Sequence, residues 1–238
     1  RYTVPNSFTA LSLLLGIASI VTTQLGDLEL AGWIIVWCGL LDVVDGVSAR
    51  LLKATSNFGA EFDSMADLVA FGVAPAVLML HAGLQLGNID IDSGQFWVLL
   101  AAVAVFTLAG AMRLARFNLV SDSPSTGWFT GVPITAAGGG LVAPIVLVLI
   151  HYPDLAASMP LHLYMPVVMF VFALLMISRL RFPKAKVRKS KLFNAFQVVS
   201  IAFVYYCGIT RSWPEILLGI GIVLLISGII AGRITRAS

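Results

Sequence analysis

Residues 40–72, LLDVVDGVSARLLKATSNFGAEFDSMADLVAFG, combine apolar runs with four aspartates, Asp42, Asp45, Asp63 and Asp67. An ionised carboxylate at the apolar centre of a membrane costs about 2.5–3.5 kcal/mol, and less near the membrane boundary. Four carboxylates in a short stretch also repel one another unless a positive charge lies between them. The stretch therefore predicts a membrane protein whose function needs these carboxylates.

The composition of the whole chain agrees with a membrane setting. Of its 238 residues, 59% are hydrophobic and 11% are charged, whereas soluble domains average about 25% charged residues. A helix needs about 20 mostly apolar residues to cross a bilayer. Segments of this kind lie at roughly 7–25, 29–52, 59–82, 95–117, 131–150, 162–180, 193–210 and 213–233. We expect an all-α fold, a polytopic bundle of about eight transmembrane helices in a single domain over residues 1–238.

The basic residues predict the orientation of the bundle. Fourteen of the fifteen Lys and Arg residues fall on one side of these segments, and Arg211 falls on the other. Because basic loops stay in the cytoplasm, we expect both termini and the aspartates on the cytoplasmic side of the cell membrane. The net charge of +3 reflects this basic face, which indicates contact with anionic lipid and not with nucleic acid.

Successive residues of an α-helix are rotated by about 100°, and this rotation places the aspartates on one face of each of two helices. One face of the first helix carries Asp42, Asp45, Gly46, Ala49 and Arg50, and the next helix carries Gly59, Asp63 and Asp67 in a narrow stripe. The short connection ATSNFG makes these helices antiparallel neighbours. We therefore expect the two carboxylate faces to converge near the cytoplasmic boundary.

A carboxylate cluster without His or Cys favours Mg²⁺, Mn²⁺ or Ca²⁺ over zinc. Four carboxylates suffice for two divalent ions, an arrangement that holds a phosphoryl group during displacement. Two other interpretations apply to intramembrane acids. A single aspartate can serve as a hydrogen-bond partner between helices, but four on two facing stripes favour a ligand site. A cation or proton carrier usually spreads its acids over several helices at mid-membrane. The segments after residue 82 hold no acid in their apolar spans apart from Glu215, which lies at the very start of the last one.

The spacing Asp42-x2-Asp45-Gly46-x2-Ala49-Arg50-x8-Gly59-x3-Asp63-x3-Asp67 resembles the signature of the CDP-alcohol phosphotransferases, integral membrane enzymes that make phospholipids. Three further stretches resemble one branch, the CDP-diacylglycerol–serine O-phosphatidyltransferases. They are YTVPNSFTALSLLLG (2–16), AMRLARFN (111–118) and FTGVPITAAGG (129–139). The resemblance covers most of the chain to about residue 190.

The resemblance implies a role for each matching residue. Asp42, Asp45 and Asp63 would bind metal and the donor pyrophosphate, and Asp67 would join the second metal and act as the general base. The CDP-lipid site would also include Gly46, Ala49, Arg50, Gly59 and Asn6. The implied reaction transfers the phosphatidyl group of CDP-diacylglycerol to the hydroxyl of L-serine with Mg²⁺ or Mn²⁺, releasing CMP. A homodimer is expected from the resemblance alone.

The acceptor site is predicted from the end of the fourth segment. Arg suits the serine carboxylate because its planar fork of donors matches two oxygens, which makes Arg113 and Arg116, followed by Asn118, the candidates. Both arginines can instead contact lipid phosphates. An acceptor that already carries phosphate, such as inositol phosphate or glycerol 3-phosphate, stays open because the basic residues of 179–191 would suit it. An archaeal ether-lipid donor also stays open.

Other features extend the prediction beyond the aspartates. The catalytic core is expected over about 1–190, with its signature at 42–67, and the last two segments, about 193–233, match no motif. The small-residue stretch GVPITAAGGG (131–140) favours either tight packing against a neighbouring helix or access for a lipid tail. Gly72 and Pro75 predict a kink in the third segment.

Overall fold

The computed structural model describes the backbone of residues 3–52, 57–120, 128–183 and 191–237. Within these ranges, the side chains of residues 3–5, 45–52, 57, 120, 128–129, 181–183, 191–198, 200 and 231–237 lie outside the description. The described chain is almost entirely helical, as expected from its sequence.

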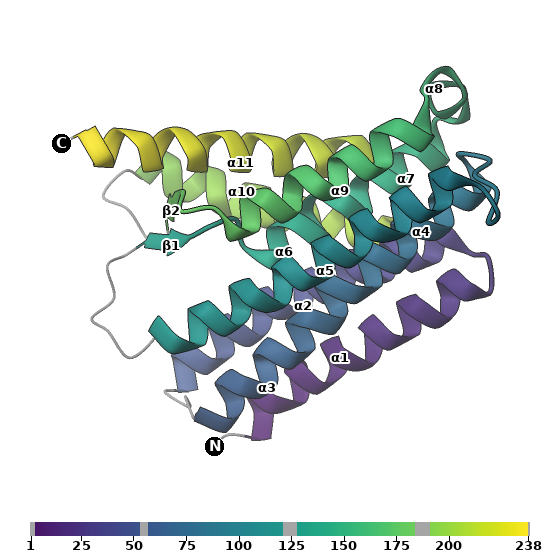
Figure 1. Ribbon diagram of the computed structural model, residues 1–238. Coiled ribbons are helices and arrows are strands. Elements are labelled where there is room, and N and C mark those ends of the chain that lie inside the picture. The colour runs from purple at the N-terminus through teal and green to yellow at the C-terminus, as the bar shows by residue number, and fades with distance from the viewer. Residues whose placement is uncertain (1–2, 53–56, 121–127, 184–190, 238) are drawn as a thin grey trace.

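Long helices lie side by side in one bundle (Figure 1). In chain order the elements are α1 (Thr3–Gln24), α2 (Leu28–Leu52), α3 (Asn57–Asp67), η1 (Leu68–Val73), α4 (Ala74–Gln85), α5 (Gly94–Val120), β1 (Trp128–Thr130), α6 (Ile134–Ala137), η2 (Gly138–Val142), α7 (Ala143–His151), α8 (Pro153–Ser158), α9 (Leu161–Ile177), β2 (Arg181–Pro183), α10 (Lys191–Thr210) and α11 (Pro214–Ala237). Helix α1 begins and α11 ends at the same end of the bundle, where α2 and α5 also end.

The helical segments lie where the apolar runs predicted them, but the number of membrane spans stays a prediction. Among the described residues, the helices long and apolar enough to cross a membrane are Asn6–Gln24, Phe58–Gln85, Gly94–Leu119 and Ile134–His151. Leu161–Ile177, Ile201–Thr210 and Pro214–Ile230 are apolar but shorter. This supports an integral membrane protein, whereas the count of about eight spans is not confirmed.

Two short strands at one end of the bundle were not predicted. β1 pairs antiparallel with β2, with Phe129 opposite Phe182 and Thr130 opposite Arg181. β1 ends at Thr130 and is followed by Gly131, whose φ of 79° is a conformation that side-chain-bearing residues seldom adopt. The chain then enters α6 at Ile134, so the helix predicted from residue 131 begins a few residues later.

Two π-helical turns interrupt the central helices and face each other. η1 joins α3 to α4 at the place where Gly72 and Pro75 predicted a kink, and η2 joins α6 to α7. A Cβ atom added to Gly138 of η2 would overlap the carbonyl oxygen of Phe71 in η1. Because only a glycine permits this approach, the two backbones touch directly. Asp67 is the residue that immediately precedes η1.

Candidate active site

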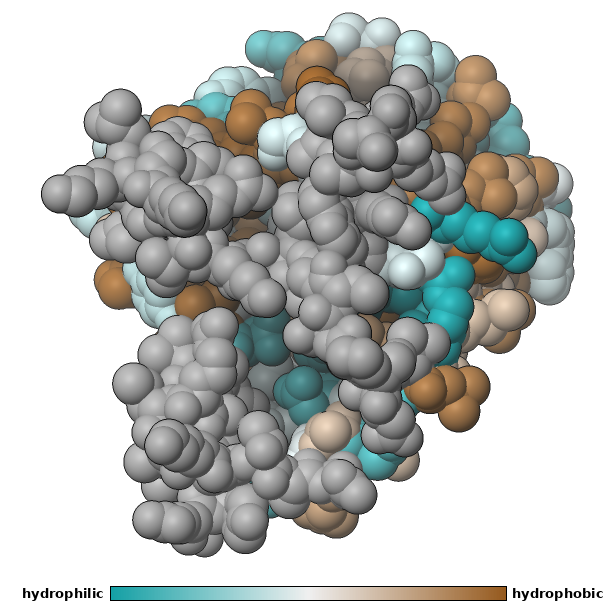
Figure 2. Space-filling model, turned by 90° about the vertical axis from the view of Figure 1, so that its left-hand side faces the viewer, coloured by the Kyte–Doolittle hydropathy of each residue, from teal (hydrophilic) through white to brown (hydrophobic). Residues whose placement is uncertain are grey.

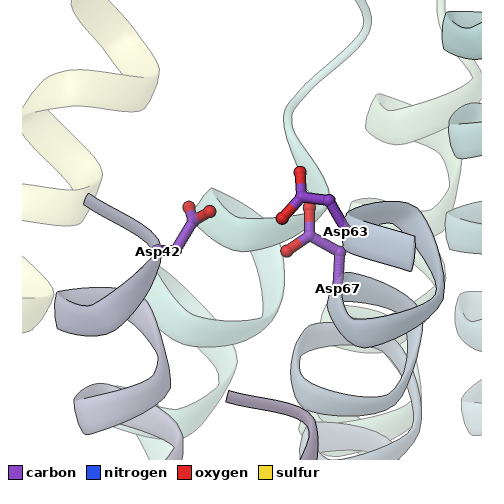
Figure 3. Close-up of side chains that lie close together, drawn as sticks. All are labelled: Asp42, Asp63 and Asp67. Carbon is purple, nitrogen blue, oxygen red and sulfur yellow. The ribbon is translucent and has the colours of Figure 1, made fainter. Parts of the chain in front are cut away.

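Three of the four predicted carboxylates converge, as the helical spacing predicted. Asp42 extends from α2 toward Asp63 and Asp67, which lie one turn apart on α3 (Figure 3). One oxygen atom from each carboxylate lies within 4.8 Å of the other two, and all three residues are partly buried. Oxygen ligands lie about 2.0–2.6 Å from Mg²⁺ or Ca²⁺, so a separation of this size is close to what one shared ion requires.

The chemistry of these donors fits a divalent metal ion. They are hard, anionic oxygen atoms contributed by two helices that follow one another in the chain, and no thiol or imidazole belongs to the described cluster. Such donors favour Mg²⁺, Mn²⁺ or Ca²⁺ over softer metals. A cation between them would also relieve the mutual repulsion of three carboxylates.

Four of the predicted site residues lie in the last part of α2. They are Asp45, Gly46, Ala49 and Arg50, and their side chains fall outside the described residues. Their roles therefore stay predictions.

Two other predicted donor-site residues are placed by the structure. Gly59 lies on α3, one turn before Asp63, and Asn6 lies near the start of α1; both are partly buried. Neither residue lines the cavity that holds the three carboxylates.

The carboxylates line a cavity of about 550 Å³, which is within the usual range for a ligand site. Asp42, Asp63, Asp67 and Arg113 supply its charged groups, and Ser64 and Thr135 add hydroxyls. The remaining described lining is apolar apart from Tyr205. Seen from the end of the bundle where α1 begins and α11 ends, hydrophilic surface lies in a hollow (Figure 2). The cavity therefore pairs a charged region with an apolar one.

The three polar side chains of RLARFN, those of Arg113, Arg116 and Asn118, contact different parts of the structure. Arg113 is 7% exposed and lines the cavity together with the carboxylates. Its guanidinium carbon lies 5.9 Å from the centre of the Phe117 ring. Of the three acceptor candidates, Arg113 is therefore the one that the structure places in the same cavity as the aspartates.

Arg116 contacts main-chain oxygen atoms. Its Nη1 donates to the carbonyl of Ile177 at 3.1 Å, and its Nη2 donates to the carbonyls of Thr130 and Met176 at 3.0 and 3.4 Å. These bonds join the end of α9 to the end of β1, next to Gly131. Arg116 is not among the residues that line the cavity.

Asn118 joins α5 to α3. Its Nδ2 donates to Oε2 of Glu61 at 3.0 Å, and its Oδ1 accepts from Oγ of Ser64 at 3.2 Å. Ser64 lies between Asp63 and Asp67 in the sequence, so this contact holds the helix turn that carries both carboxylates. Asn118 therefore contacts the support of the carboxylates and does not itself line the cavity.

The structure adds lining residues that the sequence did not single out. In the stretch 131–140, Gly138 packs tightly on Phe71, which is one of the two expectations from its composition, and Thr135, Gly139 and Gly140 line the cavity. Access for a lipid tail stays a prediction. Tyr205 of α10 and Leu217 of α11 line the cavity as well. Both come from the two segments without a motif, and apolar residues there give no sign of whether they face lipid, core or a cavity.

Comparison with known proteins places these features in one family. Residues 2–174 match the family model described as CDP-alcohol phosphatidyltransferase. The chain is 38% identical over 207 residues to a CDP-diacylglycerol–serine O-phosphatidyltransferase of Helicobacter pylori, which covers 85% of this chain and 82% of that protein. Over 182 residues it is 30% identical to the enzyme of the same name from Methanocaldococcus jannaschii, covering 76% and 74% of the two chains. The Bacillus subtilis protein of that name is 36% identical over 146 residues, covering 61% and 70%.

Proposed function

The chain belongs to the CDP-alcohol phosphatidyltransferase family, and we propose that it transfers the phosphatidyl group of CDP-diacylglycerol to the hydroxyl of L-serine, forming phosphatidylserine and CMP. Relatives at 30–38% identity carry the name of this activity. The observation that carries the proposal is the placement of Asp42, Asp63 and Asp67 within 4.8 Å of one another at a partly apolar cavity. A lipid with a pyrophosphate head needs a charged site for its head group and an apolar one for its acyl chains.

Asp42, Asp63 and Asp67, with Asp45 from the signature, would hold the divalent metal that this family uses. We propose Mg²⁺ or Mn²⁺, with two ions when the site is filled. Bound there, the metal would neutralise the donor pyrophosphate and the charge that develops on the departing CMP. Gly46, Ala49, Arg50, Gly59 and Asn6 are proposed to complete the CDP-lipid site.

Asp67 is proposed as the general base. A serine hydroxyl is a weak nucleophile at neutral pH, so it needs a base within hydrogen-bond reach. As Asp67 takes the proton, the serine oxygen bonds to the lipid-linked phosphorus, and the bond from that phosphorus to the oxygen of CMP breaks. The carboxyl of Asp67 is suited to this role because it faces the same cavity as Asp63 and Asp42.

Arg113 is proposed to bind the serine carboxylate. It brings a cation into the cavity that holds Asp67, and its fork of donors can pair with two carboxylate oxygens. We propose that Arg116 and Asn118 support this site from behind, through their contacts with α9, β1 and α3.

The setting of the reaction is also proposed. The basic end of the bundle would face the cytoplasm, so that serine reaches the site from water while the donor's acyl chains stay in the membrane. A homodimer remains part of the proposal, on the basis of the resemblance to the family.

The test measures CMP released from CDP-diacylglycerol by the detergent-solubilised protein. The reaction is run with and without Mg²⁺ or Mn²⁺, and with L-serine, glycerol 3-phosphate or inositol phosphate as acceptor. We expect metal-dependent release that L-serine stimulates more than the phosphorylated acceptors do. Preference for a phosphorylated acceptor would overturn the serine assignment, and absence of release with every acceptor would favour a carrier instead. Ester- and ether-linked donors are compared in the same assay.

A further inference from the structure

The cavity extends from the carboxylates along the bundle between α2, η2, α10 and α11. On α2 its lining runs from Asp42 back to Val36, a length of about 9 Å at 1.5 Å per residue. On α11 it runs from Leu224 to Leu217, a length of about 10 Å. The charged groups thus lie at one end of an elongated space whose other end is apolar.

Helices α10 and α11 are fastened to the rest of the bundle beside this space. The Tyr205 hydroxyl donates to the carbonyl of Leu40 at 2.6 Å, and Nε1 of Trp37 donates to the carbonyl of Gly208 at 2.6 Å. On α11, a Cβ atom added to Gly221 would overlap the carbonyl oxygen of Gly140, so the helix touches the η2 backbone directly. The two helices therefore form a fixed wall.

The side chains of this wall suit only an apolar ligand. Ile201 and Val204 of α10 and Leu217, Ile220 and Leu224 of α11 face the cavity. The hydroxyl of Tyr205 is already bonded to Leu40. A cytidine or a serine placed against the wall would lose its bonds to water without replacement. An alkyl chain would instead gain dispersion contacts there.

We propose that α10 and α11 form the acyl-chain wall of the donor site, which selects the CDP-lipid by the length and shape of one acyl chain. The inference rests on the proposed function, because a pyrophosphate at the carboxylates places the attached glycerol and the start of its chains at the mouth of this space. The family model matches residues 2–174, so the wall lies beyond the matched part of the chain. The last two helices thus belong to the substrate site and do not merely extend a core that ends near residue 190.

The test places larger side chains on the wall of the cavity and varies the length of the donor's acyl chains. Ile220→Trp and Val204→Trp add bulk from two different helices, whereas Ile226→Trp changes an α11 residue that is 51% exposed and does not line the cavity. Each protein is assayed for CMP release with dipalmitoyl and dihexanoyl CDP-diacylglycerol at saturating serine. We expect at least one cavity variant to lose roughly 5- to 150-fold in kcat/KM with the long-chain donor, as for an overpacked contact. The short-chain donor should lose less than about 3-fold, and Ile226→Trp should match the wild type with both donors.

The outcomes separate this inference from the proposed function. If wild-type protein converts neither donor, the proposed function itself fails. If it converts both, and the folded cavity variants lose activity equally with the two donors or lose none, the acyl-chain wall is wrong while the transferase assignment stands. Folding of each variant is verified by its thermal unfolding midpoint in detergent. If both Trp variants unfold, Ile220→Phe and Val204→Phe take their place, under the same criterion.

Discussion

The contact between the two π-helical turns allows a sharp prediction for Gly138→Ala. The backbone of Gly138 has helical φ and ψ, so alanine would by itself be favoured by about 1 kcal/mol over glycine. Its new Cβ, however, would lie 2.8 Å from the carbonyl carbon of Phe71 and 3.0 Å from its Cα. Carbon atoms prefer separations of about 3.5–4.0 Å, so the two turns must part by about 1 Å. The atoms in the way are main chain and cannot rotate aside.

We expect two measurable consequences of this displacement. Overpacking of this kind costs about 1–3 kcal/mol or more, so a net loss of about 2 kcal/mol would lower the thermal unfolding midpoint in detergent by about 4–8 °C. Because Asp67 immediately precedes η1, the same shift would move a proposed catalytic group. Misplacement by about 1 Å can reduce turnover by about 100-fold. CMP release at saturating donor and serine measures this loss.

Gly219→Ala is the matched control. It adds the same methyl group to a helical glycine on α11, where an added Cβ meets no atom of the described residues within 4 Å. Its unfolding midpoint and turnover should stay at or slightly above the wild-type values, because alanine favours the helix. If Gly138→Ala behaved like Gly219→Ala in both measurements, the backbone contact between η1 and η2 would not be what positions Asp67.

The other predictions concern the charged groups. Asp67→Asn should lower turnover by about 10²–10⁴-fold while titration calorimetry still detects donor binding; near-normal turnover across pH would rule out the base role. Asp42→Asn should raise the Mg²⁺ or Mn²⁺ concentration for half-maximal CMP release by about 10-fold or more, and an unchanged metal titration would contradict its role as ligand. Arg113→Lys should lower kcat/KM for serine by about 10- to 150-fold, with a smaller loss for serine methyl ester. If Arg113→Lys lost the same factor with serine and with its methyl ester, the contact with the serine carboxylate would lie elsewhere. Arg116→Lys should chiefly lower the unfolding midpoint, since the three hydrogen bonds of Arg116 to main-chain carbonyls are structural.

The convergence of the carboxylates was predictable because it depends on local geometry. Asp63 and Asp67 share a helix face at a spacing of four, and only a short stretch of chain separates α2 from α3. Helical period and loop length are both properties of the sequence itself. The same holds for the positions of the long helices, which are set by runs of apolar residues. The meeting of Asp42 with Asp63 and Asp67 is confirmed.

The destinations of Arg113, Arg116 and Asn118 were not predictable in this way. Successive helical residues differ by about 100° in direction, so each of the three faces a different neighbour. Which neighbour that is depends on how α3 and α9 pack on α5, and this is set by contacts between distant parts of the chain. The cavity-facing sides of α10 and α11 were hidden for the same reason, because lipid, core and cavity all select apolar side chains.

η1 also sets the angular phase of the helix that it interrupts. A π-helical turn carries an extra residue relative to an α-helical ladder, so the phase would change if all of Leu68–Val73 were wound as regular α-helix with no residue removed. Helix α3 would then rotate by about 100° relative to α4. With α4 held by its packed side chains, Asp63 and Asp67 would turn away from Asp42. The π-helical turn itself, and not only the spacing of the aspartates, therefore keeps the carboxylate cluster together.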